Sequence, residues 1–186
     1  MLPPEPAADL PRHALAAEVV ACQCVEVPES NRNTDTIGPK APYAFGARAQ
    51  YDYRVSGRWS VGAVGGYEYV TYPDHYAPDH ASVGLLGAVL AHRTNGEFLR
   101  GGVRLAGGFS HARDGAAAWT TPGYFLEFDG ELAVPVVRTV ELFLDVGILR
   151  VRQFYWGADR PRYGKTWMYA MLIVPLSGSL GLRYRF

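Results

Sequence analysis

Cysteine and long apolar runs are the first things that this sequence lacks. Cys22 and Cys24 are the only cysteines among 186 residues, and at positions i and i+2 of one strand their thiols are poorly placed to form a bridge. A disulfide scaffold is therefore excluded, and we interpret both cysteines as small residues that face inward. The uncharged runs 81–91 and 167–182 are short or interrupted by Pro175 and Gly178, so no transmembrane helix is predicted.

Net charge is absent as well. The 18 Lys and Arg residues equal the 18 Asp and Glu residues in number, so the formal net charge is zero. Nucleic-acid-binding domains carry a clustered excess of positive charge, so we expect no nucleic-acid partner. We also expect no cofactor.

What the sequence does have is alternation with a period of two residues. Over 167–186, the even positions are apolar or small, and the odd positions after Ile173 are Pro, Ser, Gly or Arg. This pattern indicates a strand with two different faces. One face could meet lipid and the other a polar interior, as in a membrane barrel.

The same pattern recurs along the chain and predicts eight strands. We expect them at 17–27, 43–55, 59–72, 81–93, 98–110, 123–135, from 140 onward, and at 167–186. The connections between them alternate between long and short, as in outer-membrane barrels with short periplasmic turns and longer external loops. The predicted fold is therefore all-β: an eight-stranded antiparallel up-and-down transmembrane β-barrel over 16–186, preceded by a disordered tail over 1–15. The unbroken alternation of the last segment argues against splitting it at 175–179.

Aromatic residues near the strand ends predict which face is outside. One group of aromatics would lie near the periplasmic interface: Tyr51, Tyr53, Trp59, Tyr184 and Phe186. A second group would lie near the outer interface: Tyr43, Phe45, Tyr67, Tyr69, Phe109 and Tyr124. Two such girdles are typical of a barrel that spans a bilayer. The alternative is a soluble β-sandwich, because composition alone does not say which face is inside.

The opposite face carries charges of both signs. The arginines on it are Arg48, Arg54, Arg100, Arg104, Arg183 and Arg185. The carboxylates are Glu18, Glu26, Asp52, Glu68, Glu127, Asp129, Glu131, Glu141 and Asp145. The interior of an eight-stranded barrel is only wide enough for its own side chains, and unpaired charges there would be costly. We therefore predict a structural arginine–carboxylate network, no catalytic carboxylates and no wide pore.

The closing residues 180–186, with the sequence LGLRYRF, carry a family resemblance. They resemble the C-terminal signal of Gram-negative outer-membrane proteins, which implies that Tyr184 and Phe186 are read by the barrel assembly machinery. With eight strands, the chain resembles the small barrels of the OmpA, OmpX and OmpW type without matching one named family. The resemblance implies a bacterial outer-membrane location, contact with outer-membrane lipid and lipopolysaccharide, and a signal peptide removed or replaced at the start. Residues 1–15 are not a peptidoglycan-binding domain, so the anchoring role of OmpA is not implied.

The favoured function is a structural or surface-interaction role for a monomeric barrel, with membership of a larger complex as an alternative. Basic residues gather at the outer end of the seventh strand and in the last loop: Arg150, Arg152, Arg160, Arg162 and Lys165. Guanidinium groups bind phosphates well, so these residues are predicted to contact lipopolysaccharide. Arg150 and Arg152 are expected to continue the lipid-facing parity that includes Ile148.

Three other functions stay open. A lipid A-modifying enzyme, either an acyl hydrolase or a transferase, would need a nucleophile and a base at the rim, but Ser110 and His111 are strand neighbours that face opposite sides. No catalytic residue is therefore predicted. A transporter of small apolar solutes would need an apolar lumen and a lateral opening. Finally, the loop that repeats Pro-Asp-His could bind a divalent metal or could simply form turns; its candidate ligands are Asp74, His75, Asp79 and His80.

Overall fold

The computed structural model describes residues 11–29, 43–71, 80–94, 96–114, 120–156 and 168–186. At residues 23–29, 80–81, 114, 120–121, 152–156 and 168–176 it describes the backbone alone. Within the described ranges, no helix is long and apolar enough to cross a membrane.

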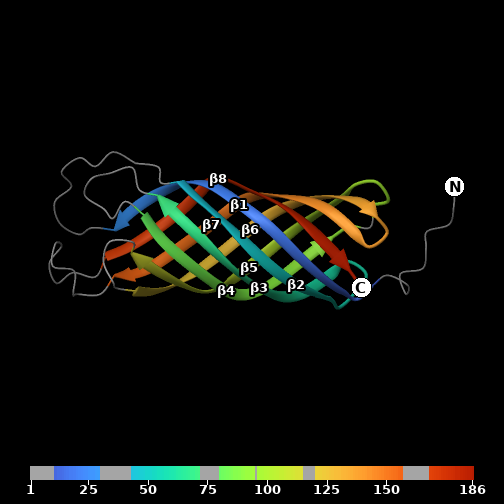
Figure 1. Cartoon of the computed structure of the whole chain (residues 1–186), viewed down its shortest axis with the longest axis horizontal. Helices are drawn as coiled ribbons and strands as arrows, with labels where there is room; N and C mark the ends of the chain where they lie inside the picture. The colour runs from blue at the N-terminus through green and yellow to red at the C-terminus, as the bar shows by residue number, and fades with distance from the viewer. Residues whose placement is uncertain (1–10, 30–42, 72–79, 95, 115–119, 157–167) are drawn as a thin grey trace.

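Eight antiparallel strands close into one barrel (Figure 1). They are β1 (His13–Glu29), β2 (Tyr43–Arg54), β3 (Trp59–Thr71), β4 (His80–Arg93), β5 (Arg100–Asp114), β6 (Thr120–Val137), β7 (Val140–Trp156) and β8 (Met168–Arg185). Each strand pairs with the next in the sequence, and β8 pairs with β1. Closure removes free sheet edges, which lipid does not tolerate. The predicted fold class is confirmed.

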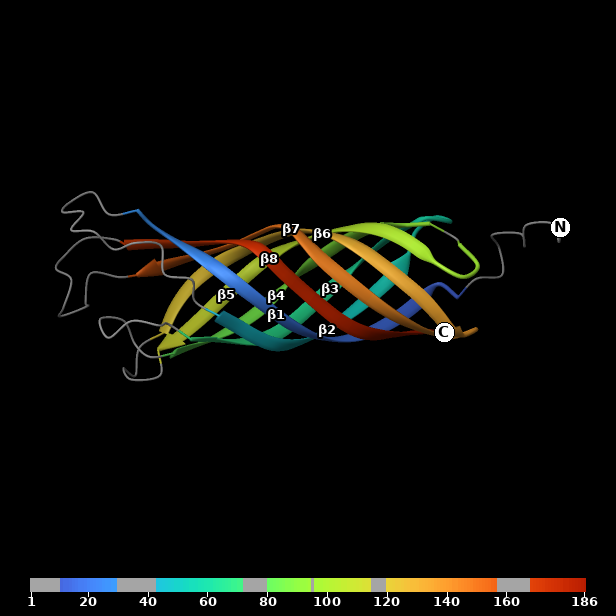
Figure 2. The ribbon, with the colours of Figure 1, turned by 90° about the horizontal axis from the view of Figure 1, so that it is seen from above.

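The two ends of the barrel differ in the length of their connections. The short connections 55–58, 94–99 and 138–139 lie at the end where the C-terminus lies (Figure 1). Backbone hydrogen bonds join the first and last strands there, from Phe186 N to His13 O at 2.9 Å and from His13 N to Phe186 O at 3.2 Å. Figure 2 shows the strands winding obliquely around the common axis, as barrel closure requires. We call the end with the short connections the periplasmic end and the other the outer end.

The boundary between tail and barrel is the clearest error in the predicted segments. β1 begins at His13, so part of the stretch assigned to the tail pairs with both neighbours, His13 with Tyr53 and Ala14 with Arg185. Alternation already operates there, because Ala14 is buried whereas Leu15 is exposed. The proline-rich composition before these residues had concealed it.

The two faces of the sheet are inverted relative to a water-soluble protein. Large apolar side chains such as Val19, Leu86 and Leu182 are more than half exposed, whereas Asp129 and Asp145 are completely buried. An apolar surface around a charged interior is unfavourable in water and required in lipid. The barrel therefore spans a membrane, and the soluble sandwich is excluded.

The aromatic girdles lie where the sequence predicts. At the periplasmic end Tyr51, Tyr184 and Phe186 are exposed, and Trp59 packs edge-on against His92 with ring centroids 4.8 Å apart. Among the aromatics predicted for the outer girdle, Tyr43, Phe45, Tyr67, Phe109 and Tyr124 are exposed, and Tyr69 packs against Phe45.

Paired bulges in β7 and β8 break the alternation that the sequence suggested. Ile148 is an extra residue in β7, because Phe128 pairs with Leu149 whereas Asp129 pairs with Gly147. The prediction that Arg150 faces lipid is therefore wrong: Ile148 and Leu149 are both exposed, and Arg150 is 1 % exposed.

In β8, the two residues 174 and 175 stand opposite the single residue Cys24 of β1, so the unbroken alternation predicted for β8 is also wrong. Proline cannot donate a hydrogen bond to the ladder and is confined in sheets to edges and bulges. Pro175 therefore marks this bulge in the sequence.

Candidate functional site

The middle of the lumen is filled by a network of ion pairs centred on Arg104. Its guanidinium nitrogens lie 2.8 Å from Asp129, 3.2 Å from Glu18 and 3.3 Å from Asp145. Arg104 also donates a hydrogen bond of 3.0 Å to the side-chain oxygen of Gln50. One side chain from β5 thereby connects β1, β2, β6 and β7 across the lumen.

A second arginine shares these carboxylates. Arg48 on β2 pairs with Glu68 on β3 and, at 2.8 Å, with Glu127 on β6. Glu18 lies 3.8 Å from Arg48 and also accepts a 2.7 Å hydrogen bond from the Ser179 hydroxyl. The shared carboxylates make the centre of the lumen one network instead of separate pairs.

A further layer of ion pairs lies toward the periplasmic end. Arg183 lies 2.7 Å from Glu131 and 3.3 Å from Glu141, and Arg93 lies 2.7 Å from Glu131 and 3.1 Å from Asp52. Glu141 also pairs with Arg100 and Arg185. The predicted structural network is thus confirmed among the described side chains. Sequence reasoning missed Arg93, because alternation was ambiguous in its strand.

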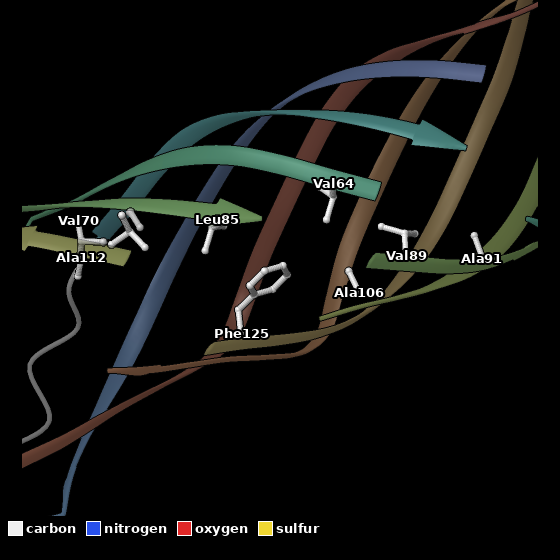
Figure 3. Packing of buried hydrophobic residues seen from close by; sticks show 10 residues of the cluster. Val64, Val70, Leu85, Val89, Ala91, Ala106, Ala112 and Phe125 are labelled. Carbon is white, nitrogen blue, oxygen red and sulfur yellow. The ribbon is translucent and has the colours of Figure 1, made fainter. Parts of the chain in front are cut away.

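Part of the lumen is apolar, which sequence reasoning did not predict. Buried side chains from β2 to β6 form one cluster: Ala44, Val64, Val70, Val83, Leu85, Val89, Ala91, Ala106, Ala112 and Phe125. Figure 3 shows the Phe125 ring pointing into the interior among side chains of the other strands. The signal was present in β4, where buried Val83, Leu85 and Val89 lie two or four residues apart, but Leu85 and Leu86 are both apolar and obscured the parity.

Glycines allow the interior to fill this tightly. Gly181 pairs directly with Phe143. A Cβ at Gly181 would overlap the Phe143 ring and lie 2.6 Å from the carbonyl oxygen of Ala17. The same ring carries Arg183 on its face, with the guanidinium carbon 4.6 Å from the ring centroid. Packing of an aromatic ring over a cross-strand glycine is a device that fixes strand register.

Most of the predicted binding residues lie outside the described side chains. This holds for the metal candidates Asp74, His75, Asp79 and His80, and for Arg152, Arg160, Arg162 and Lys165 of the lipopolysaccharide group. Glu26 of the predicted interior set also falls there. Arg150 is the exception: it lies in the lumen, where its Nε donates a 2.8 Å hydrogen bond to Asp129.

Two other residue pairs are described in full. Ser110 is buried in the lumen and His111 is exposed on the outer surface, so they do not form a nucleophile–base pair. In the closing strand, the rings of Tyr184 and Phe186 stack with centroids 5.8 Å apart, and Phe186 also stacks on His13 at 5.7 Å. The outward aromatic face is therefore formed, while its recognition during assembly stays a prediction.

One exposed cation at the outer end was missed. Arg113 lies next to the last residue of β5, two residues beyond His111 on the outward face, and is exposed. It forms no ion pair within the described part of the chain. The sequence signal was its odd-numbered parity in β5, shared with Leu105 and Phe109, which face lipid.

Comparison with known proteins defines the class of fold. No family model matches the sequence, and no curated protein matches it. Among solved structures, the outer membrane protein OprG from Pseudomonas aeruginosa is 10 % identical, with a TM-score of 0.56 over 95 % of this chain and 97 % of that one. Neisserial surface protein A is 18 % identical, with a TM-score of 0.48 over 94 % and 97 %, and Ail of Yersinia pestis is 13 % identical, with a TM-score of 0.41 over 95 % and 100 %.

The chain therefore has the fold of a small bacterial outer-membrane β-barrel. At these identities the likeness establishes the fold alone, and it rests on the match to OprG. The exposed apolar belt and the charged interior described above agree independently with a barrel of this class.

Proposed function

We propose that this protein is a closed outer-membrane barrel that acts through its external face, while its lumen serves as a rigid core. The observation that carries the proposal is the filled interior. Arg48, Arg104 and Arg183 are each at most 4 % exposed and pair with carboxylates from several strands. A passage for solutes would need this network to open, which would leave buried charges uncompensated.

The partner that we propose at the external face is lipopolysaccharide. Arg113 presents an exposed guanidinium at the outer end of β5. Arg152 lies in β7 near its outer end, and Arg160, Arg162 and Lys165 belong to the connection that follows β7. Guanidinium groups pair with phosphates through two parallel hydrogen bonds, and lipopolysaccharide presents phosphates at this level of the membrane. Arg150 is withdrawn from the group because it is buried.

Thermal unfolding in bilayers with and without lipopolysaccharide tests this contact. Added lipopolysaccharide should raise the unfolding temperature of the parent protein, since a ligand that binds only the folded state stabilises it. The variant Arg160→Gln/Arg162→Gln/Lys165→Gln, with or without Arg113→Gln, should lose most of that increase. Arg138→Gln is the matched control, because Arg138 is exposed in a turn at the periplasmic end. An equal increase in all variants would contradict lipopolysaccharide binding at these residues.

Conductance in planar bilayers tests the closed lumen separately. We expect no stepwise current from the parent protein, and current steps only from a variant that empties both charged layers, Arg104→Ala/Arg183→Ala. Stable channels formed by the parent protein would contradict the proposal.

Two observations weigh against the other candidate functions. Ser110 and His111 face opposite sides, which disfavours a lipid A-modifying enzyme. The apolar lumen residues pack against one another instead of lining a passage, which disfavours a transporter of apolar solutes.

A further inference from the structure

The periplasmic mouth of the barrel contains a cavity whose wall is rich in arginine. Its volume is about 50 Å³, enough for a small polyatomic group. Six arginines belong to its described lining: Arg12, Arg54, Arg58, Arg93, Arg183 and Arg185. Asp52 is the one carboxylate among the described lining residues.

Among the described residues, ion pairs balance only part of this positive charge. Glu131 and Glu141 lie behind the lining and pair with Arg93, Arg183 and Arg185. Together with Asp52, they supply three carboxylates for Arg93, Arg183 and Arg185. Within the described part of the chain, Arg12 and Arg58 take part in no ion pair, although Arg12 lies beside Arg54, whose N–H donates a 2.7 Å hydrogen bond to the Arg12 carbonyl.

Donor atoms at this site also lack partners. Nη2 of Arg93 and Nε of Arg183 are buried and make no hydrogen bond within the described structure. The Arg183 side chain is 2 % exposed, so these donors are costly to leave unsatisfied. Two exposed guanidinium groups without an ion pair, next to buried donors without a hydrogen bond, provide the chemistry that binds an oxyanion.

We propose that the periplasmic mouth binds one phosphate group. A dianion offsets the excess of positive charge better than a single carboxylate, and its oxygens match the guanidinium donors. Phosphate oxygens are offered by a soluble phosphate in the periplasm, which carries up to two negative charges near neutral pH, and by the phosphodiester headgroup of a phospholipid in the inner leaflet, which carries one. The anion does not pass from the mouth into the central layer of the lumen, because carboxylates outnumber arginines there. The carboxylates are Glu18, Glu68, Glu127, Asp129 and Asp145, and the arginines are Arg48, Arg104 and Arg150. The site is independent of the proposed function at the outer end.

Titration of the full chain with inorganic phosphate tests the proposal. The protein is refolded in dodecylmaltoside, which carries no phosphate, and its amide and arginine Hε resonances are followed by NMR. Saturable shifts are expected at Gly57, Ser60 and Arg93, which line the cavity. Sodium chloride at equal ionic strength should not reproduce them.

Matched variants distinguish a specific phosphate site from non-specific electrostatic attraction of anions. Arg12→Gln/Arg58→Gln removes two exposed arginines from the cavity and should weaken phosphate binding about tenfold or more. Arg138→Gln removes an exposed arginine at the same end of the barrel, outside the cavity lining, and should leave the affinity unchanged. Retained heat-modifiable gel migration shows that each variant is folded. Equal effects of phosphate and chloride, or equal affinities of the two variants, would overturn the proposal.

Phosphatidylglycerol added to the same micelles identifies the source of the phosphate. If it shifts the same resonances and blocks inorganic phosphate, the natural occupant is a lipid headgroup. If inorganic phosphate binds equally well in its presence, the occupant is a soluble phosphate.

Discussion

Replacement of Arg104 by methionine measures how much the central network contributes to stability. Methionine keeps much of the side-chain length but removes the charge. Four carboxylates lie within 4 Å of Arg104, and three of them retain another arginine in its absence: Glu18 and Glu127 retain Arg48, and Asp129 retains Arg150.

Asp145 is the carboxylate that Arg104→Met isolates. Arg104 is its only ion-pair partner among the described residues, and its remaining contact is a 3.5 Å hydrogen bond from Ser179. Asp145 is completely buried. Removal of one partner from a buried pair costs about 3–5 kcal/mol, because it leaves an uncompensated charge. We therefore expect Arg104→Met to lower the free energy of unfolding by about 3–5 kcal/mol.

Urea unfolding in lipid vesicles, followed by tryptophan fluorescence, measures this loss. The double variant Arg104→Met/Asp145→Asn should recover most of it, because asparagine carries no charge. Arg138→Met, in an exposed turn, should change stability by less than about 0.5 kcal/mol. A loss below about 1 kcal/mol for Arg104→Met, or a double variant no more stable than the single one, would show that water screens the lumen and that the network does not hold the barrel together.

Two further predictions concern packing and strand register. Gly181→Ala should destabilise the barrel by about 1–3 kcal/mol, because the new methyl group overlaps the Phe143 ring. Gly130→Ala is the control, since its methyl group would meet nothing closer than 3.8 Å. Equal losses of stability for the two variants in the urea unfolding assay would refute the packing argument. Spin labels in a cysteine-free background should be accessible to lipid-dissolved oxygen at Leu149 and shielded at Arg150, whereas regular alternation without the bulge would give the reverse result.

Period-two alternation was sufficient to predict the barrel, because each strand must place apolar groups in lipid and polar groups in the lumen. The predicted arginine–carboxylate network followed from the same parity and from the narrow interior. In β4 the alternation is weak, because apolar residues lie on both faces: Val83, Leu85 and Val89 are buried, whereas Leu86 is exposed. The apolar half of the lumen was therefore not predicted.

Bulges set the other limit on sequence reasoning. A single extra residue reverses the parity of everything beyond it. The bulge at Ile148 moved Arg150 from the predicted lipid face into the lumen. Gly147, which directly precedes it, is only a weak signal, because glycines recur throughout these strands. Pro175 did signal the companion bulge in β8, although its meaning depends on the register with β1, which a single strand does not reveal.

Because both β7 and β8 carry a bulge, the pairing between these two strands keeps its register. β7 and β8 keep one register from Val140 to Trp156, because Val146 pairs with Gly178 and Val151 with Ile173. The register shifts occur instead where β7 meets β6 and where β8 meets β1. β7 and β8 are thus offset as a pair by one residue relative to β6 and β1, and this offset places Arg150 2.8 Å from Asp129. The bulges supply the central, carboxylate-rich layer of the lumen with an additional cation, which a regular barrel of the same sequence would have placed in lipid.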